Sequence, residues 1–259
     1  MTSYNFGGLE KLPAKDQVKL LHRYGYNGII LKCATIEDFQ NIDRHIEAVE
    51  RTDNFRIDAI FERYNFEDPA QRRERWKKVV DKISGKKIQI WLIFGKKTEG
   101  VNDAFIERKL REIVAYAAPK GVEVILYPHS SCYIESAEEA LPFVEKVNHP
   151  QLKLAFHLYH EIRAKNGSRL DEVMKRVQHR LGAVTLAGTD QVADYSSARA
   201  RDSSTIKPLG QGDYDLRGFV RILKSSGYKG AVGLMNFKLP EAPSNYLPRS
   251  LEIWKRYQE

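Results

Sequence analysis

The chain has few cysteines, no long hydrophobic run and no signal-like start. Its two cysteines, Cys33 and Cys132, are far apart and lack CxxC spacing, which argues against a disulfide framework and a cysteine-based zinc site. No run of about eighteen apolar residues is present, so we expect no membrane-spanning segment. The first residues, MTSYNFGGLEK, lack the basic and then apolar layout of a secretion signal. A reducing, cytoplasmic location is the default expectation, with a trimmed secretion signal as the alternative.

Common motifs of nucleotide and hydrolytic chemistry are also missing. The sequence has no GxGxxG, P-loop, GxSxG or HExxH pattern, so these chemistries have no motif support. It has no internal repeat and no linker rich in Gly or Pro. With 259 residues and 42% hydrophobic content, the chain can bury a large core, as one barrel-sized domain or as two smaller ones.

The charge balance is basic. A formal net charge of +8 favours anionic partners such as phosphate groups, acidic glycans or nucleic acid. The densest basic stretch, residues 71–87, mixes basic and apolar residues at helical spacing. We interpret it as a solvated helix face, with a binding surface as the alternative. A nucleic-acid partner is therefore not favoured, and no pattern indicates an oligomeric state.

Short apolar runs alternate with amphipathic helices along the chain. The runs are apolar throughout, as buried parallel strands require. We predict strands at 5–8, 28–33, 57–61, 88–94, 122–127, ahead of His157, at 183–187 and at 230–236. We predict helices at 13–24, 35–51, 68–85, 102–118, 136–147, 168–181, 215–226 and 246–257. The order favours an α/β fold, a single closed (β/α)8 TIM barrel over residues 1–259, with an open doubly wound sheet as the alternative.

Polar side chains follow many of the predicted strands. In parallel α/β sheets, chemistry collects at the carboxyl ends of the strands, because the loops there vary without disturbing the core. If the barrel is closed, these residues ring one mouth. They are Asn5, Lys32, Glu62, Arg63, Lys96, Tyr127, His129, His157, His160, Asp190, Asn236 and Lys238.

Glu62 and Lys32 end neighbouring predicted strands. A lysine in a partly dry pocket titrates low enough to move protons, so the two could form an acid/base pair. The alternative is a structural salt bridge between them.

Three histidines, His129, His157 and His160, close the two strands on either side of the helix at 136–147. Three imidazoles at strand ends suit zinc, so they could bind a divalent metal. Their spacing is no recognised ligand signature, and hydrogen-bonded or surface histidines are the alternative.

One long segment, residues 188–213, lacks apolar periodicity and follows the seventh predicted strand. Loops of this length in compact domains are often functional, so it could be a lid over a ligand or a plain insertion. Its Arg199, Arg201 and Lys207 could hold a phosphate or carboxylate, or could serve solubility. Aromatic residues near the mouth could stack on sugar rings or pack the barrel: Tyr127, Tyr159, Tyr214, Trp91 and Phe237.

The order of these features resembles a known family. A strand ending in Tyr127-Pro128-His129, a strand ending in His160 and a strand ending in Asp190 are followed by PLGQGDYD at 208–215, GYKGAVGLMNF at 227–237 and RSLEIWK at 249–255. The pattern is similar to that of the xylose isomerase-like TIM barrels, the sugar isomerases and epimerases that also include the endonuclease IV repair enzymes. The resemblance covers nearly the whole chain and is most specific at GQGDYD and GYKG.

The resemblance implies a divalent metal held by Glu, Asp, His and Glu at the ends of strands five to eight. Here those positions carry Tyr127, His157, a residue near Ala187, and Met235 or Asn236. The usual ligands are absent, so the resemblance places the chain in a divergent branch. Its metal site is either lost or rebuilt from the three histidines.

These observations give one leading hypothesis and two others. The leading one is an enzyme that isomerises or epimerises a carbohydrate or sugar derivative by proton abstraction. In it Glu62 or His129 is the base, Lys32 stabilises an enolate oxygen, and His157 and His160 orient hydroxyls. Further candidate substrate contacts are Tyr127, Asp190, Asn236 and Gln211. The others are a non-catalytic carbohydrate-binding barrel and, less favoured, an endonuclease IV-like nuclease.

Overall fold

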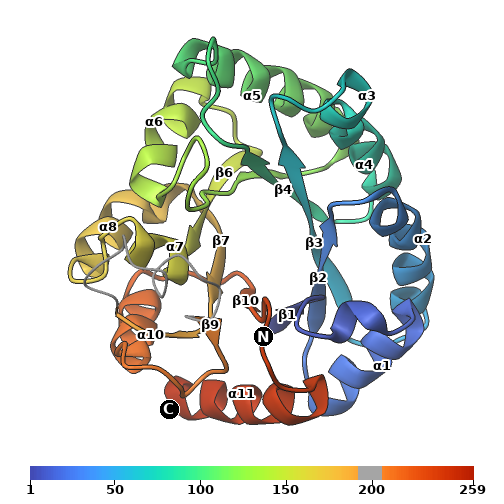
Figure 1. Ribbon diagram of the computed structural model, residues 1–259, viewed down its shortest axis with the longest axis vertical. Helices are drawn as coiled ribbons and strands as arrows, with labels where there is room; N and C mark the ends of the chain where they lie inside the picture. The colour runs from blue at the N-terminus through green and yellow to red at the C-terminus, as the bar shows by residue number, and fades with distance from the viewer. Residues whose placement is uncertain (192–205) are drawn as a thin grey trace.

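In the computed structural model, residues 1–191 and 206–259 are described. Within them, parallel strands close a barrel in the order β1-β10-β7-β6-β5-β4-β3-β2, with helices around it (Figure 1). The closed (β/α)8 prediction is confirmed, and the open sheet is wrong. The barrel strands are β1 (Thr2–Tyr4), β2 (Gly28–Cys33), β3 (Arg56–Tyr64), β4 (Gln89–Phe94), β5 (Val124–Leu126), β6 (Leu152–His157), β7 (Leu181–Leu186) and β10 (Val232–Leu234).

The helices cover the outside of the barrel and begin at recognisable caps. Thr35 and Asp38 form a reciprocal capping box at the start of α2, as the sequence predicted for Thr35. Asn102 and Ser136 cap α5 and α6 through their side chains. The helices are α1 (Ala14–Tyr24), α2 (Ile36–Glu50), α3 (Ala70–Arg73), α4 (Arg75–Ile83), α5 (Asp103–Ala117), α6 (Ala137–Val147), α7 (Leu158–Arg163), α8 (Leu170–Val177), α10 (Leu216–Ser225) and α11 (Pro243–Gln258). Short 3-10 turns lie at Leu9–Lys11, Ala118–Lys120 and Gln178–Arg180.

Two predicted boundaries are wrong for identifiable reasons. The first strand is Thr2–Tyr4 and does not include the predicted range 5–8, where Gly7 and Gly8 adopt φ of 63° and 96°, outside the strand region. The helix predicted at 68–85 is two helices broken at Glu74, whose φ of −91° and ψ of 6° lie in the bridge region. After the break, Arg75 and Trp76 are both buried.

Large aromatic residues fill the barrel beneath its carboxyl end. The hydroxyls of Tyr4 and Tyr127 lie 2.7 Å apart, and the ring of Tyr127 stacks on Trp91 with centroids at 5.5 Å. Tyr4 and Tyr127 are fully or almost fully buried. This aromatic layer closes the barrel interior, so a ligand can approach only from above it.

The long segment predicted at 188–213 is only partly described. It begins with β8 (Gly188–Thr189), which pairs antiparallel with β9 (Ile206–Lys207). Arg199, Arg201 and the proposed lid lie outside the described residues. Among residues 1–191 and 206–259, no helix has the length and apolarity needed to span a bilayer.

Candidate functional site

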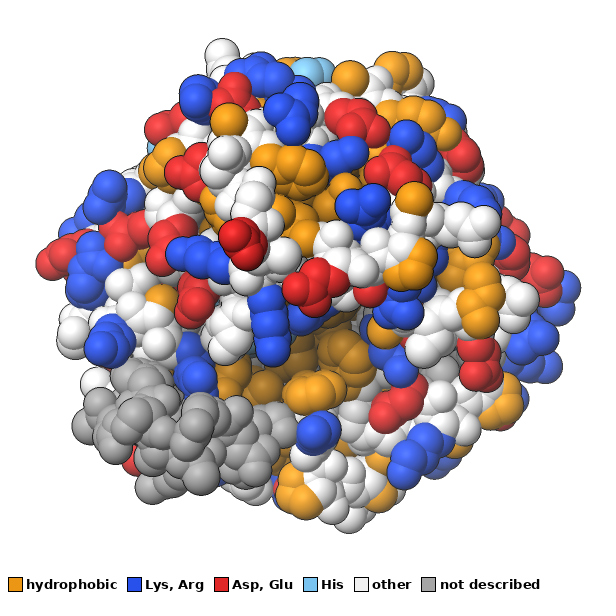
Figure 2. Space-filling view, turned by 45° about the horizontal axis from the view of Figure 1, so that its top comes forward, with side chains coloured by type: hydrophobic (Ala, Val, Ile, Leu, Met, Phe, Trp, Pro, Cys, Tyr) orange, Lys and Arg blue, Asp and Glu red, His pale blue; other side chains and the backbone are white. Residues whose placement is uncertain are grey.

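A cavity of about 1030 Å³ opens at the carboxyl ends of the barrel strands. Figure 2 shows the hollow with hydrophobic side chains at its bottom and Lys and Arg side chains on its rim. Its volume suits a small organic ligand. The wall includes Phe6, Lys32, Phe61, Arg63, His129 and Phe237.

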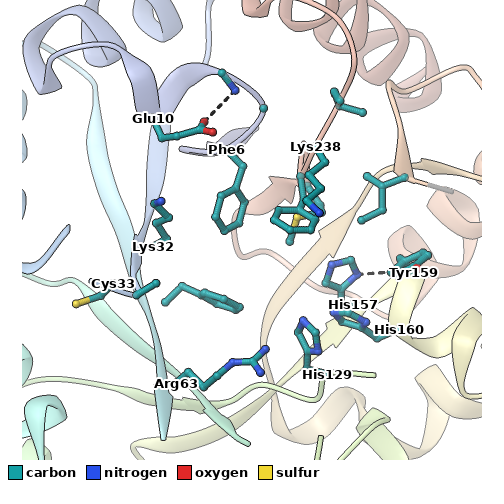
Figure 3. Close-up of a pocket in the computed structure, with 18 of the residues that line it drawn as sticks. Phe6, Glu10, Lys32, Cys33, Arg63, His129, His157, Tyr159, His160 and Lys238 are labelled. Atoms are coloured by element: carbon teal, nitrogen blue, oxygen red, sulfur yellow. Dashed lines mark hydrogen bonds between the residues drawn. The ribbon is translucent and has the colours of Figure 1, made fainter. Parts of the chain in front are cut away.

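Strand pleating decides which side chains of β2 and β3 reach the cavity. Lys32 pairs in register with Phe61, and Cys33 pairs with Glu62. Because successive side chains of a strand point to opposite faces, Lys32, Phe61 and Arg63 turn toward the cavity. Cys33 turns away in Figure 3. Glu62 shares the outward face and does not line the cavity.

Glu62 bonds to a helix instead of to Lys32. Its carboxylate accepts hydrogen bonds from Arg75 of α4, the shortest at 2.7 Å, and is almost fully buried. Burial raises the pKa of Glu62 above its usual range, and Arg75 opposes that shift. Lys32 lies 3.6 Å from Asp38. The predicted Lys32–Glu62 pair, as acid and base or as a salt bridge, is therefore wrong.

His157 and His160 both present N–H donors. His157 ends β6, whereas His160 lies in the first turn of α7 and not at the strand end as predicted. The Nδ1 atoms accept hydrogen bonds from the backbone N–H groups of Tyr159 (3.2 Å) and Ser130 (3.3 Å). A neutral imidazole carries one proton, so both rings carry it on Nε2. In the described parts of the chain, Nε2 of His157 has no hydrogen-bond partner.

His129 presents the opposite tautomer. Its Nδ1 donates to the carbonyl oxygen of Ser130 at 2.8 Å, which leaves Nε2 as an unprotonated acceptor. The ring centroid of His129 lies 4.1 Å from that of His160, which lies 4.2 Å from that of His157. All three line the cavity, opposite Lys32 in Figure 3. This histidine wall (His129, His157 and His160) therefore offers one acceptor and two donors.

The histidine wall is uncharged at neutral pH. Burial lowers the pKa of His129 to about 4, and the positive charge of Arg63 adds to that effect. Burial likewise lowers the pKa of His157 to about 3 and that of His160 well below its usual range. Arg63 points toward His129 in Figure 3. Arg63 therefore carries a permanent positive charge beside the neutral imidazole of His129.

A divalent metal does not fit the histidine wall. To bind through Nε2, His157 and His160 would have to move their protons to Nδ1, where the N–H groups of Tyr159 and Ser130 already point. Within the described residues, no group of three or more His, Cys, Asp or Glu side chains is arranged to hold a metal ion. The predicted triad of His129, His157 and His160 as a metal site is wrong in this geometry.

Four further predicted contacts do not line the cavity. Tyr127 lies in the aromatic layer below it. Asn236 is fully buried and donates to the carbonyl oxygens of Tyr4 and Phe6 at 3.1 Å, which ties the ends of β10 and β1 together. Asp190 forms a 2.8 Å ion pair with Lys207, and Gln211 is exposed in a turn beyond β9.

The aromatic predictions divide in the same way. Tyr159 and Phe237 line the cavity, whereas Trp91 is buried beneath it and Tyr214 lies outside it. Phe61 and Phe6 also line it, and sequence reasoning gave them no role. The signal was available for Phe61, since it alternates with Glu62 on β3.

The strand order and the surrounding helices define a (β/α)8 protein with a cavity at the carboxyl ends of its strands. The chain belongs to the xylose isomerase-like TIM barrel family, whose model matches residues 40–257. No curated protein sequence matches the chain significantly.

Solved structures with the same fold are distant in sequence. D-allulose 3-epimerase from Methylomonas sp. is 16% identical, with a TM-score of 0.78, and the match covers 99% of this chain and 96% of that one. D-psicose 3-epimerase from Clostridium cellulolyticum H10, solved with D-tagatose, is 14% identical, with a TM-score of 0.75 and coverage of 100% and 99%. The probable 3-DHS dehydratase AsbF from Bacillus anthracis is 13% identical, with a TM-score of 0.75 and coverage of 98% of each chain. At these identities the likeness concerns the fold.

Proposed function

We propose that this protein is an enzyme that abstracts a proton from a carbohydrate or sugar derivative, with His129 as the base. The observation that carries this proposal is the unprotonated Nε2 of His129 on the cavity wall, fixed by the bond from Nδ1 to Ser130. Structural neighbours solved with D-allulose and with D-tagatose support a sugar-sized ligand. Phe6 and Phe237 add apolar faces against which a sugar ring can stack.

The proposed step is isomerisation or epimerisation at a carbon next to a carbonyl. Nε2 of His129 takes the proton from that carbon, and the electron pair of the C–H bond moves into the carbonyl to give an enolate. The ammonium group of Lys32 stabilises the enolate oxygen. For isomerisation, the hydroxyl proton of the substrate's enol shifts to the enolate oxygen, and His129 then returns its proton to the former carbonyl carbon. For epimerisation, water protonates the original carbon on its opposite face, and His129 releases its proton to solvent. With a pKa of about 4, His129 is neutral at neutral pH but a weak base, so stabilisation of the enolate must supply much of the rate.

We further propose that this branch of the family has lost the usual metal site. Tyr127 and His157 stand where the family pattern implies carboxylates at strands five and six. The hydrogen bonds to Nδ1 of His157 and His160 keep their protons on Nε2, which disfavours a replacement metal site built from the histidines. No step of the mechanism above is assigned to a metal.

The test is exchange of carbon-bound hydrogen with solvent. The protein is incubated with a panel of ketoses and aldoses in D2O, and deuterium incorporation is followed by NMR. We expect incorporation into at least one sugar and a loss of about a hundredfold or more in His129→Gln. His179→Gln, at an exposed histidine that pairs with Glu145, serves as the matched control and should exchange normally. Equal exchange in His129→Gln and wild type would remove the role of His129.

A second candidate function is carbohydrate binding without catalysis. It is favoured by one observation: Glu62, the other base that the sequence suggested, is bound to Arg75 and leaves only the weakly basic His129. Calorimetric binding of a sugar, with no deuterium incorporation and no product by mass spectrometry, would establish this alternative over the first.

A further inference from the structure

We propose that Arg63, His157 and His160 form a binding site for an anionic group, a carboxylate or a phosphate, carried by the ligand of this cavity. We call these three residues the anion site. The inference deepens the proposed function, because it specifies the class of sugar derivative that the cavity accepts. The inference rests on the proposed function for the statement that the ligand is a sugar derivative. The anion site itself can be tested separately with inorganic ions.

The hydrogen-bonding capacity of the wall is the first argument. His157 is 1% exposed and lines the cavity, yet its Nε2–H has no partner in the described part of the chain. The described hydrogen bonds of His160 all involve Nδ1, so its Nε2–H is not used either. A buried donor without an acceptor costs about 1–3 kcal/mol in general. A ligand oxygen that accepts from Nε2–H of His157 removes that cost.

The unpaired charge of Arg63 is the second argument. Two other arginines on the cavity wall have carboxylate partners: Arg72 lies 3.0 Å from Asp68, and Arg75 lies 2.7 Å from Glu62. None of the ion pairs among residues 1–191 and 206–259 includes Arg63. Its guanidinium is available to bind a carboxylate or phosphate with two parallel hydrogen bonds.

The charge of the whole cavity agrees with this assignment. The lining contains six basic and two acidic side chains, and one of the acidic ones, Glu241, is bound to Arg249 at 2.7 Å. A low-dielectric cavity with a basic lining attracts anions. The basic side chains are those of Lys11, Lys32, Arg63, Arg72, Arg75 and Lys238.

His157 stands at the end of strand six, where the family pattern implies a carboxylate ligand, and it presents an N–H donor there instead. The same donors would bind either a carboxylate or a phosphate, and the experiment is arranged to separate these two sources. Neutral sugars lack a group that could neutralise Arg63.

The experiment is a titration of the full-length protein, labelled with ¹⁵N at histidine, with inorganic phosphate and separately with acetate. We expect a saturable shift of the Nε2 resonances of His157 and His160 with one or both ions. Arg63→Gln should weaken that binding by about tenfold or more, because a charge-assisted pair of hydrogen bonds is lost. A response to phosphate alone assigns a phosphorylated ligand, and a response to acetate alone assigns a carboxylated one.

Arg72→Gln is the matched control. It removes the same charge from the same cavity, but its guanidinium already pairs with Asp68, so the titration should be unchanged. Equal effects of Arg63→Gln and Arg72→Gln, or no saturable shift in the wild type, would overturn the anion site. Thermal unfolding of each variant confirms that it is folded. If the ions bind as expected but no sugar exchanges deuterium, the proposed enzymatic function fails while the anion site stands.

Discussion

Whether a polar residue at a strand end lines the cavity or contacts a surrounding helix depends on the face of the strand that it occupies. Glu62 and Arg63 are neighbours at the end of β3, yet Arg63 faces the cavity and Glu62 faces α4. The guanidinium of Arg75 bonds to Glu62 and also donates to the carbonyl oxygens of Thr35 and Cys33. One buried arginine thereby joins α4, β3 and the end of β2. This arrangement gives Glu62 a structural role.

Glu62→Gln should destabilise the fold, because it leaves the buried guanidinium of Arg75 without a counter-charge. Removing one partner of a buried pair costs roughly 3–5 kcal/mol, and the retained hydrogen-bonding oxygen of Gln places the expected loss near the lower end. Urea unfolding measures it. Glu145→Gln, at an exposed carboxylate, is the control and should change the free energy of unfolding by less than about 0.5 kcal/mol. Unchanged stability together with lost ligand turnover would instead place Glu62 in the catalytic site.

At the scale of elements, the sequence predicted the closed barrel and the convergence of Lys32 and the three histidines on one cavity. The apolar runs and their alternation with helices carry that information, because buried parallel strands have few other solutions. It was harder to predict which side chains at the strand ends point into the cavity. The sequence shows that Phe61 and Arg63 lie on the face of β3 opposite to Glu62. Which of these faces lines the cavity depends on the register of β3 with β2.

Other parts of the site depend on contacts that no local pattern contains. The protons of His157 and His160 are fixed by backbone N–H groups, one of them thirty positions away in sequence, at Ser130. The partner of Glu62 comes from α4, thirteen positions further along the chain. Such contacts follow from the way loops and helices pack on the barrel. The sequence therefore predicted where the polar residues gather, but it did not predict their hydrogen-bond partners or the positions of the histidine protons.

The junction between α6 and α7 contains a buried carboxylate that makes stability depend on pH. Glu161 accepts hydrogen bonds at 2.7 Å from the backbone N–H of Ala137 and from the side chain of Asn166. Burial nevertheless raises its pKa from 4.5 to about 7, helped by the negative charges of Glu138 and Glu139. The folded state therefore holds the proton more tightly than the unfolded chain does.

Glu161 should therefore contribute stability that is fully present below about pH 4.5 and is lost as the pH rises through about 7. A shift of this size corresponds to a total loss on the order of 3 kcal/mol. The measurement is urea unfolding of the wild type and of Glu161→Gln at several pH values between 4.5 and 8. The difference in free energy of unfolding between them should move in favour of Glu161→Gln as the pH rises. A constant difference across this range would show that Glu161 does not titrate there.

At the scale of the whole molecule, the protein is basic, and several of its positive side chains line the cavity above the aromatic layer. The net charge of +8 is partly compensated on the helices, for example where Lys109 pairs with Glu112 and Arg169 pairs with Glu138. In the cavity, Arg63 lacks such compensation among the described residues. We therefore expect the mouth to attract anions and to repel cations.

This electrostatic arrangement predicts that the protein does not depend on a bound metal. A divalent ion at the histidine wall would meet the charge of Arg63 and would require His157 and His160 to place protons on Nδ1, against the N–H groups of Tyr159 and Ser130. Elemental analysis of the purified protein should therefore find no stoichiometric transition metal, and a chelator should leave the melting temperature unchanged. Added zinc or manganese that raises the melting temperature of the wild type but not of His129→Gln would contradict this prediction, because only an ion bound at the wall would produce that difference.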